Sequence, residues 1–415
     1  MDFLTHLKTY LSDEEIAKLD ASLKGNSEHA LLLNTEKMSE ETLLSIYPNL
    51  KRHPIVKNGF IYDKNVLDLG KSIYHELGCF YLQEPSAMLP AYLLNPNSND
   101  VVLDMCAAPG GKSMQASLLM QNEGLIIAND IARNRVGAIL ENAERLGRGN
   151  LLITNNDLSS IDTRFNNTFD KIILDAPCSG SGMFRKDIKM MNDWSYQKVL
   201  KNAEIQKNLI LMAYQMLKPG GTMVYSTCSF SFEEDEEIIQ YLLDHSDASL
   251  KDIADSPLYY RSKQKGYGVH LLPFLFPGEG HYICLINKPG IIKYKEKQTN
   301  YTLKEDFGQY RFLISQPFNY KYLNVVRYGV KMGLIDKGEI RFDYHYSRFV
   351  KDFDNALEIG LEPLLKYYQG ESLNYITKKG YVLLKYQGIN VDIAKSDGRI
   401  IKNRLPKGLR KKFIV

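Results

Sequence analysis

Cysteine is scarce in this 415-residue sequence, and none of the five cysteines is spaced as a metal-binding or disulfide pair. Cys79, Cys106, Cys178, Cys228 and Cys284 are scattered, odd in number and without C-x-x-C spacing. This pattern argues against a disulfide framework and against a zinc site, so we expect no bound metal. Free thiols suit a reducing cytoplasm, where they stay available for chemistry.

Long apolar runs are also missing. No stretch approaches the roughly eighteen apolar residues that a membrane-spanning helix needs. The N-terminal segment lacks the apolar core flanked by basic residues that marks a secretory signal. With 44% apolar and 24% charged residues, the composition is that of a globular protein. We expect a cytoplasmic monomer with no membrane partner, and its length predicts two or three domains.

Acidic side chains are few in the C-terminal third. Residues 289–415 hold 24 Lys and Arg against 13 Asp and Glu, whereas the rest of the chain holds 28 against 36. The same third holds 13 of the 27 tyrosines, and residues 398–412 carry seven basic side chains and no acid. A basic appendage on an acidic body favours a polyanion such as nucleic acid as partner, with a solvated lysine-rich surface as the simpler alternative.

The order of apolar runs and breakers predicts three regions. Residues 1–75 form a small α+β module with a helix capped by Ser12 and Glu15. Residues 76–288 alternate strands and helices, which predicts an α/β fold, a mostly parallel sheet with helices on both faces. A polar linker at 288–299 marks the boundary to residues 289–415, where short strand-like runs alternate with short helices. The predicted strands of the sheet are 101–105, 125–130, 151–156, 170–175 and 221–227, the helices are 112–121, 133–146, 197–217 and 233–244, and a closing antiparallel pair is 268–275 with 281–287.

The first strand of this sheet leads into the turn VVLDMCAAPGGKS, residues 101–113. A strand, a glycine turn and a helix start bring backbone N–H groups to one point, where an anionic or polar cofactor binds. The turn lacks G-x-G-x-x-G, which disfavours a dinucleotide. It comes close to a P-loop with Gly111, Lys112 and Ser113, and the strand ending in Asp175 could supply that loop's metal ligand. Cys106 stands where the first P-loop glycine belongs, and its Cβ would obstruct the loop, so a P-loop NTPase is the weaker alternative.

Acidic residues follow three further strands. Asp130 comes about twenty residues after the turn, a position suited to ribose hydroxyls. Asp157 follows the next strand and suits an adenine amino group, and Asp175 follows the fourth. Each acid alone is more often a helix cap. Together, at the rim where open α/β sheets bind ligands, they favour a nucleoside cofactor without a triphosphate, and S-adenosylmethionine fits that arrangement.

Two cysteines end neighbouring strands at the same rim. Cys178 stands in DAPCSGSG and Cys228 in STCS, whereas Cys79 and Cys284 have the surroundings of small buried hydrophobic residues. A thiolate that adds to carbon 6 of a cytosine makes carbon 5 nucleophilic enough to accept a methyl group. A nearby aspartate can hydrogen-bond or protonate the ring as the thiolate adds. The spacing alone does not decide which thiol attacks.

Three motifs then carry a family likeness. DMCAAPGGKS, DAPCSGSG and YSTCS, in this order, resemble the Nol/Nop/Sun family of RNA cytosine-5 methyltransferases, and KPGG and LLPFLFPGEGHY agree with it. The resemblance covers residues 76–288 and implies the Rossmann-like S-adenosylmethionine-dependent fold. The tail KNRLPKGLR resembles bacterial members of the RsmF type, which methylate small-subunit ribosomal RNA. This second resemblance implies a linking domain at 289–365 and a PUA-like α+β RNA-binding domain at 366–415. One departure is His281-Tyr282, where the family usually has an aromatic residue directly after GEG.

The resemblance implies roles for individual residues. Cys228 is the attacking nucleophile, Cys178 releases the methylated RNA, and Asp175 lies between cofactor and target base. Arg185 and Lys186 are candidate contacts to RNA phosphates. The implied cofactor residues are Cys106, Ala107, Ala108, Pro109, Gly110, Gly111, Lys112, Asp130, Arg135, Asp157 and Asp175, and the implied RNA contacts of the tail are Arg404, Lys407, Arg410 and Lys411.

The sequence thus predicts an S-adenosylmethionine-dependent RNA cytosine-5 methyltransferase acting on ribosomal RNA, possibly within the small subunit. The target cytosine must be unpaired or flipped out, because a paired base is out of reach. Two alternatives are the P-loop NTPase and an RNA-binding protein that has lost its chemistry. The presence of both cysteines and Asp175 disfavours the second alternative.

Overall fold

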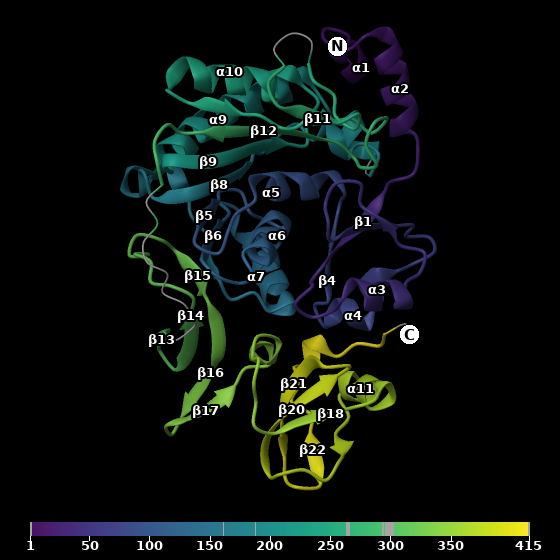
Figure 1. Cartoon of the computed structure of the whole chain (residues 1–415), viewed down its shortest axis with the longest axis vertical. Coiled ribbons are helices and arrows are strands. Elements are labelled where there is room, and N and C mark those ends of the chain that lie inside the picture. The colour runs from purple at the N-terminus through teal and green to yellow at the C-terminus, as the bar shows by residue number, and fades with distance from the viewer. Residues whose placement is uncertain are drawn as a thin grey trace.

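The computed structural model describes residues 2–160, 162–186, 188–262, 266–292, 294 and 303–413. Figure 1 shows a twisted sheet with helices on both faces, an N-terminal module beside it and two further β-rich parts below. Within the described residues, no helix combines the length and the apolar character needed to cross a membrane. Residues 293 and 295–299 of the predicted linker lie outside the described residues.

The central sheet has nine strands in the order β10-β12-β9-β8-β5-β6-β7-β15, with β11 paired to β12. Neighbours among β5, β6, β7, β8 and β9 are parallel, and β10, β11, β12 and β15 are antiparallel additions. The predicted parallel sheet and the closing pair are confirmed. The strands are β5 (Val101–Asp104), β6 (Leu125–Asn129), β7 (Leu151–Thr154), β8 (Phe169–Asp175), β9 (Leu217–Thr227), β10 (Ser249–Lys251), β11 (Val269–Leu271), β12 (His281–Asn287) and β15 (Val325–Tyr328).

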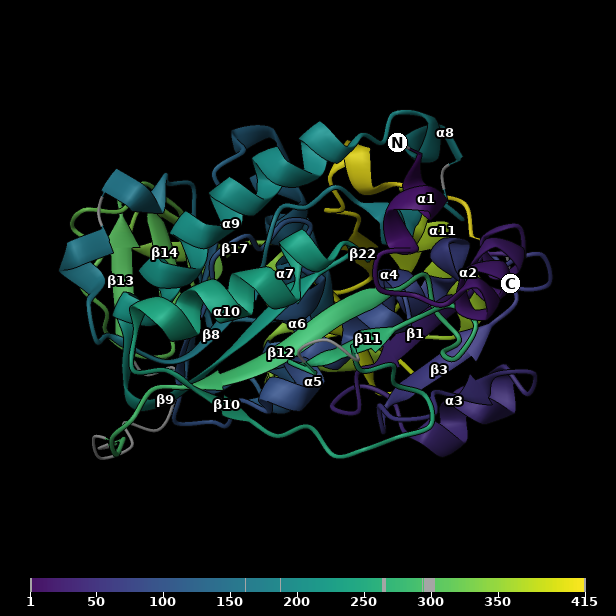
Figure 2. The same ribbon diagram turned by 90° about the horizontal axis from the view of Figure 1, so that it is seen from above.

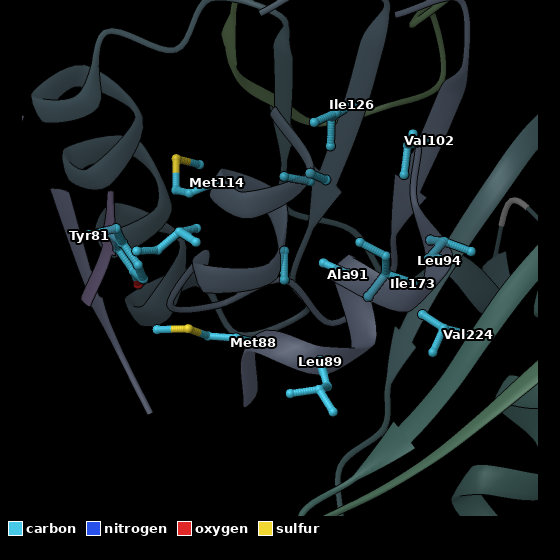
Figure 3. Packing of buried hydrophobic residues seen from close by; sticks show 14 of the residues in the cluster. Tyr81, Met88, Leu89, Ala91, Leu94, Val102, Met114, Ile126, Ile173 and Val224 are labelled. Atoms are coloured by element: carbon cyan, nitrogen blue, oxygen red, sulfur yellow. The ribbon is translucent and has the colours of Figure 1, made fainter. Parts of the chain in front are cut away.

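Alternate residues of the parallel strands enter two different cores. Val102, Ile126 and Ile173 face helices α5, α6 and α7 (Figure 3), whereas Leu103 and Ile172 face α9 and α10 on the other side. Strands buried on both faces read as continuous apolar runs, which is why their positions follow from the sequence. Figure 2 shows α9 and α10 lying along one face of the sheet. The helices are α5 (Leu89–Leu94), α6 (Gly111–Leu119), α7 (Arg133–Leu146), α8 (Ile188–Asn192), α9 (Tyr196–Met216) and α10 (Glu236–His245).

The N-terminal module contains a four-stranded sheet in the order β2-β3-β1-β4, which packs with helices α3 and α4. Helices α1 and α2 pack instead with Phe184, Trp194 and Phe230 of the central region. The predicted cap is confirmed, because Ser12 and Glu15 form a capping box at the start of α2. Strand β4 follows residue 75, so this sheet extends past the predicted boundary. The elements are α1 (Phe3–Leu7), α2 (Asp13–Leu23), β1 (His29–Leu33), α3 (Glu40–Ile46), β2 (Lys51–Arg52), β3 (Gly59–Tyr62), α4 (Ile73–Glu76) and β4 (Phe80–Gln83).

The C-terminal third forms two small sheets, ordered β13-β14-β16-β17 and β18-β20-β21-β22-β19. Its strand β15 leaves both of them and pairs with β7 at the edge of the central sheet, across the predicted boundary at 288. The elements are β13 (Leu303–Phe307), β14 (Tyr310–Ile314), β16 (Val330–Asp336), β17 (Glu339–Phe342), β18 (Ala356–Glu358), α11 (Leu361–Tyr368), β19 (Leu373–Asn374), β20 (Gly380–Tyr386), β21 (Ile389–Ser396) and β22 (Ile400–Lys402). Short 3-10 helices are η1 (Leu69–Lys71), η2 (Ser86–Met88), η3 (Leu158–Ser160), η4 (Asp162–Phe165), η5 (Ser181–Met183), η6 (Phe232–Glu234), η7 (His345–Arg348) and η8 (Lys407–Leu409).

The N-terminal module and the last sheet share one hydrophobic core. Leu31 and Phe60 of the first belong to the same buried cluster as Leu364 of α11 and residues of β20 and β21. At its edge the rings of Tyr74 and Tyr386 lie 6.3 Å apart, and the Tyr74 hydroxyl donates to Gln387 Oε1 at 3.1 Å. The first and last parts of the chain therefore bury apolar side chains against each other. Figure 1 shows the last sheet directly below α3 and α4.

This shared core predicts coupled unfolding. Leu364 is fully buried, so Leu364→Ala should lower the free energy of unfolding by about 2–5 kcal/mol through lost burial and an unfilled cavity. Hydrogen exchange should show weaker protection in β1 and β3 as well as in β20. Loss of protection in β20 alone would contradict the shared core. Leu365→Ala, at a partly exposed position of the same helix that is not part of this cluster, is the control.

Candidate active site

Two thiols meet where β8 and β9 end. The strands are parallel neighbours and pair Asp175 with Ser226, so the loops that follow leave the sheet side by side. The Sγ atoms of Cys178 and Cys228 lie 3.0 Å apart, and both cysteines are free and partly exposed. The loops touch closely, because the Gly182 N–H donates to the Cys228 carbonyl at 2.7 Å. A Cβ at Gly182 would lie 2.7 Å from the Gly280 carbonyl oxygen, so this position requires glycine.

The contact between the sulfurs changes the acidity of Cys178. Together with burial, it raises the pKa of Cys178 well above its ordinary value. Cys178 therefore keeps its proton near neutral pH, and either sulfur can be the donor in the contact. Cys79 and Cys284 are buried at 0% and 1% exposure, as the sequence predicts for core residues.

Asp175 is held by three side chains from different elements. Lys112 Nζ lies 2.7 Å from Oδ2, the Ser226 hydroxyl donates to Oδ1 at 2.7 Å, and His281 Nε2 lies 3.3 Å from Oδ1. Burial would raise the pKa of Asp175, but Lys112 and His281 together hold it well below its usual range. The carboxylate is therefore ionised and accepts hydrogen bonds.

His281 is the contact that the sequence did not reveal. Its position after GEG marked it only as a departure from the family pattern, and nothing local ties β12 to Asp175. Its Nδ1 faces the Gly280 carbonyl at 3.1 Å while Nε2 faces Asp175, so both ring nitrogens face acceptors. The ring nitrogen that carries the proton donates to one of these two oxygens.

The predicted cofactor turn follows β5, and α6 begins at Gly111. Gly110 has φ +106°, a left-handed conformation that explains the glycine there. The Ala108 N–H donates to Asp130 Oδ2 at 3.1 Å, and Arg135 donates to the Ala108 carbonyl at 2.5 Å. Four members of the turn, Cys106, Ala107, Ala108 and Pro109, form the loop itself. The structure thus brings both Asp130 and Arg135 to this loop.

Asp157 lies farther out on the rim. It follows β7, is exposed, and accepts the Ser159 N–H at 3.0 Å, as a residue that caps a short helix would. The ends of β6 and β7 are joined nearby, because the Asn129 side-chain amide donates to the Asn156 carbonyl at 3.1 Å. Asp157 therefore lies on the predicted edge of the sheet.

Asp104 is a further carboxylate of this site that the sequence did not single out. It ends β5 at 1% exposure, and its Oδ2 accepts the Ser113 hydroxyl at 2.6 Å. Its Oδ1 has no hydrogen-bond partner among the described residues. Burial raises the pKa of Asp104 to about 7, although the Ser113 hydrogen bond opposes the shift. An orphaned acceptor beside this turn fits a cofactor that carries a positive charge and N–H donors.

Two of the predicted RNA contacts, Arg185 and Arg404, bind groups within the protein instead. The Arg185 side chain is 7% exposed and binds inside the protein, with Nε 3.1 Å from Glu279 and a nitrogen donating to the Gly278 carbonyl at 2.7 Å. Arg404 donates to two backbone carbonyls, and Lys411 pairs with Glu76 at 2.9 Å. Long cations bury their stems and find local carbonyls readily, which the charge count of a segment does not reveal. Lys186, Lys407 and Arg410 are exposed.

The chain matches three family models in succession. Residues 1–85 match the N-terminal domain of 16S rRNA methyltransferase RsmF, residues 91–287 match 16S rRNA methyltransferase RsmB/F, and residues 354–411 match the methyltransferase RsmF PUA domain. The Ribosomal RNA small subunit methyltransferase F of Vibrio campbellii is 31% identical over 98% of this chain and 95% of its own length. The chain belongs to the RsmB/F methyltransferase family.

Other relatives of this family agree. The tRNA (cytosine(49)-C(5))-methyltransferase of Pyrococcus abyssi is 40% identical over 56% of this chain and 71% of its own length. A methyltransferase homologue from Pyrococcus horikoshii, solved by crystallography, has a TM-score of 0.61 at 29% identity and covers 68% of this chain and 93% of that one. NSun6 of Pyrococcus horikoshii, at 23% identity and a TM-score of 0.62, shows the same fold.

Family membership confirms the predicted RNA cytosine-5 methyltransferase, its cofactor S-adenosylmethionine and the Rossmann-like fold with a C-terminal PUA domain. The P-loop alternative is wrong. Lys112, which would bind phosphates in a P-loop, is instead 9% exposed and paired with Asp175. The turn at residues 106–112 resembles a P-loop because both connect a strand to a helix through a glycine-containing turn.

The orphaned Asp104 oxygen predicts a proton release when the cofactor binds. With a pKa of about 7, Asp104 is partly protonated at neutral pH. A cation bound beside it favours the carboxylate, so S-adenosylmethionine should release about half a proton at pH 7. Calorimetry in buffers of different ionisation enthalpy measures the number. Asp104→Asn should abolish the release. An equal release from that variant would place the titrating group elsewhere.

Proposed function

We propose that this RsmB/F member methylates carbon 5 of one or more cytosines in small-subunit (16S) ribosomal RNA through a covalent adduct with Cys228. The observation that carries the proposal is the pair of thiols 3.0 Å apart beside the Asp175–Lys112 ion pair. A single sulfur would suffice for addition, so the second sulfur calls for a second step in the reaction.

Distinct roles for the two sulfurs are supported by the family pattern and by the state of Cys178. The YSTCS motif resembles the family motif that carries the attacking cysteine, so we assign addition to Cys228. Cys178 keeps its proton, because burial and the neighbouring sulfur raise its pKa. It is a thiol beside the nucleophile, available for the later steps.

The proposed chemistry begins when the Cys228 thiolate forms a bond to carbon 6 of an unpaired cytosine, which moves the 5,6 double-bond electrons onto carbon 5 and the ring. S-adenosylmethionine, when bound, supplies the electrophilic methyl group that carbon 5 takes up. Carbon 5 then loses its proton to a base, the 5,6 double bond re-forms, and the Cys228–carbon 6 bond breaks with its electrons returning to sulfur. We assign Cys178 to this release.

Asp175 acts as an acceptor in this scheme. Because Lys112 and His281 keep it ionised, it can accept a hydrogen bond from the cytosine amino group or from a protonated ring nitrogen, and it does not itself provide the proton. The residues proposed to hold the cofactor are the loop from Cys106 to Lys112 with Asp130, Arg135 and Asp157. Asp104 joins them because of its free oxygen.

Binding of ribosomal RNA is assigned to the C-terminal module, with the enzyme acting as a cytoplasmic monomer. The support is the match to a PUA domain and a set of exposed cations in the tail. Arg404 is bound to two backbone carbonyls. The exposed cations of the tail are Arg399, Lys402, Lys407, Arg410, Lys411 and Lys412, of which Lys411 pairs with Glu76. Phosphate contacts by such side chains give affinity without sequence specificity.

Cysteine substitutions test the reaction. With S-adenosylmethionine and 16S RNA that lacks 5-methylcytosine, Cys228→Ala should give neither product nor covalent adduct. Cys178→Ala should accumulate a protein–RNA adduct that survives denaturation, because addition proceeds and release does not. A denaturing gel detects the adduct, and mapping of 5-methylcytosine identifies the target. Naked RNA and isolated small subunits are compared as substrates.

The control for these variants is Cys79→Ala, a thiol in the core of the N-terminal module, which should leave turnover unchanged. An adduct that builds up in Cys228→Ala instead would reverse the two roles. Wild-type protein that methylates another position, or no RNA at all, would refute the proposed function.

The tail predicts a change in salt dependence. Lys402→Gln, Lys407→Gln and Lys412→Gln together should weaken RNA binding and make the slope of log K against log salt shallower by about 2, at roughly 0.7 per lost phosphate contact with single strands. Fluorescence anisotropy over a salt series measures the slope. Lys366→Gln, which removes a cation paired with Glu362, should leave it unchanged. An unaltered slope in the triple variant would exclude the tail as an RNA contact.

A further inference from the structure

Behind the two thiol loops lies a fully buried carboxylate, Glu234 of η6. Its Oε1 accepts the Ser179 N–H at 2.7 Å, and its Oε2 accepts the Ser179 hydroxyl at 2.5 Å and the Ser229 hydroxyl at 2.6 Å. Gln206 of α9 donates to Oε1 at 3.3 Å. The two serines directly follow Cys178 and Cys228. One side chain thus binds the residue next to each sulfur.

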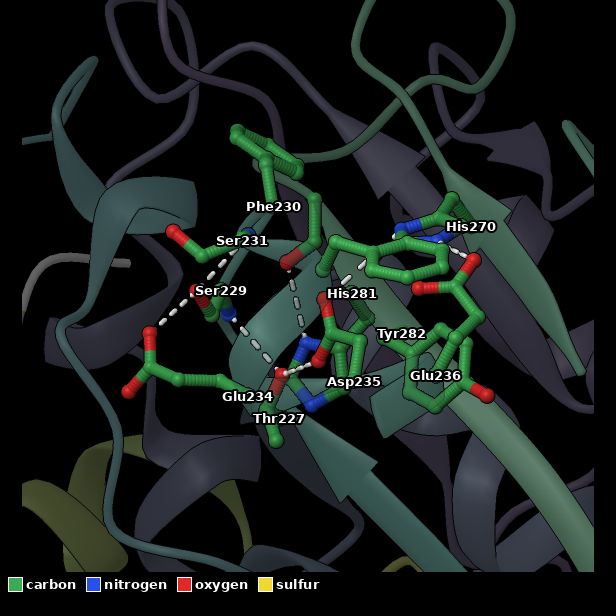
Figure 4. Close-up of polar contacts among 12 residues, drawn as sticks. Thr227, Ser229, Phe230, Ser231, Glu234, Asp235, Glu236, His270, His281 and Tyr282 are labelled. Atoms are coloured by element: carbon green, nitrogen blue, oxygen red, sulfur yellow. Dashed lines mark hydrogen bonds and ion pairs between the residues drawn. The ribbon is translucent and has the colours of Figure 1, made fainter. Parts of the chain in front are cut away.

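Most donors to the Glu234 carboxylate come from the two loops that carry the thiols. A buried carboxylate is costly unless it is hydrogen-bonded, and here three of the four donors come from the two cysteine loops. The serine hydroxyls lie 3.2 Å apart, so the loops converge on the carboxylate as well as on each other. The Tyr225 hydroxyl donates to the Glu234 carbonyl at 2.6 Å, which fixes the backbone of Glu234 against β9. Figure 4 shows Glu234 reaching toward Ser229.

A second branch holds the Cys228 loop from its other side. Thr227 donates to Asp235 Oδ1 at 2.6 Å and accepts the Ser229 N–H at 3.1 Å. Of the two cysteine loops, this branch contacts the one after β9, and Asp235 also faces His270 of β11 at 3.9 Å. Glu234 is therefore the acid of this segment that spans both loops.

We propose that Glu234 is a positioning residue that sets the separation of Cys178 and Cys228, and so couples nucleophilic addition by one thiol to release by the other. The inference rests on the proposed function for its catalytic meaning. The spacing it describes can be measured without any methyl transfer.

The test uses disulfide formation as a measure of proximity. Diamide oxidises two neighbouring thiols to a disulfide while its N=N bond takes up both hydrogens, and mass spectrometry of the full-length protein follows the Cys178–Cys228 product. Glu234→Gln preserves volume but replaces one acceptor oxygen by an N–H donor. We expect oxidation to slow by about tenfold or more, because small displacements of reacting groups have large effects on rate.

Alkylation with N-ethylmaleimide is measured in parallel, because it reports access to each thiol separately. We expect it to stay at the wild-type rate. The control is Glu237→Gln, which removes a charge from an exposed position of α10 and should alter neither rate. Unchanged oxidation in Glu234→Gln would overturn the proposal. A parallel fall in oxidation and alkylation would also overturn it, since the carboxylate would then govern access and not spacing.

Should Glu234→Gln fail to fold, as judged by thermal unfolding and binding of S-adenosylhomocysteine, the double variant Ser179→Ala and Ser229→Ala decides. It removes both hydroxyl contacts and keeps the carboxylate and the Ser179 N–H, and the same slowed oxidation is expected. An RNA adduct on Cys228 should also persist longer in this variant, because cleavage of the Cys228–carbon 6 bond is slower. If wild-type protein methylates no RNA, the proposed function fails, while the oxidation rates still settle the spacing.

Discussion

The site depends on parallel pairing of β5, β8 and β9, whose carboxyl ends reach one edge of the sheet. The ladder pairs Asp104 with Ile173 and Asp175 with Ser226, so the residues after each strand enter the same space. A slip of one residue would turn every side chain to the opposite face. The short intervals from Asp175 to Cys178 and from Ser226 to Cys228 then bring two sulfurs from different loops to 3.0 Å.

Two carboxylates at this edge of the sheet have different surroundings. Asp175 faces Lys112 and His281, which hold its pKa far below the usual range, whereas Asp104 has only a hydroxyl and a pKa raised by burial to about 7. Asp175 is therefore ionised, whereas Asp104 is partly protonated at neutral pH. Two neighbouring carboxylates at one edge of the sheet differ in this way because one contacts Lys112 and His281 and the other is buried beside a single hydroxyl.

Much of this could be predicted from local sequence. The five parallel strands and four helices follow from apolar runs and breakers, and the helix predicted at 133–146 is α7 as observed. The contacts that tune the site could not be predicted in this way. His281 reaches Asp175 from a strand about a hundred residues later, and Glu234 contacts Ser179 across two loops. Such pairs depend on sheet order, and a single sequence carries no local trace of them.

The dependence of contacts on sheet order also explains why the C-terminal third differs from what its sequence alone suggests. The C-terminal third is basic as a segment, yet Arg404 donates to two backbone carbonyls within the protein, and β15 extends the central sheet. With β15 attached to β7 and the last sheet packed on the N-terminal module, the C-terminal third is attached to the rest at two separate places. Two attachments restrict rotation that a single linker would allow. The exposed cations of the tail thus keep a set position relative to the thiols.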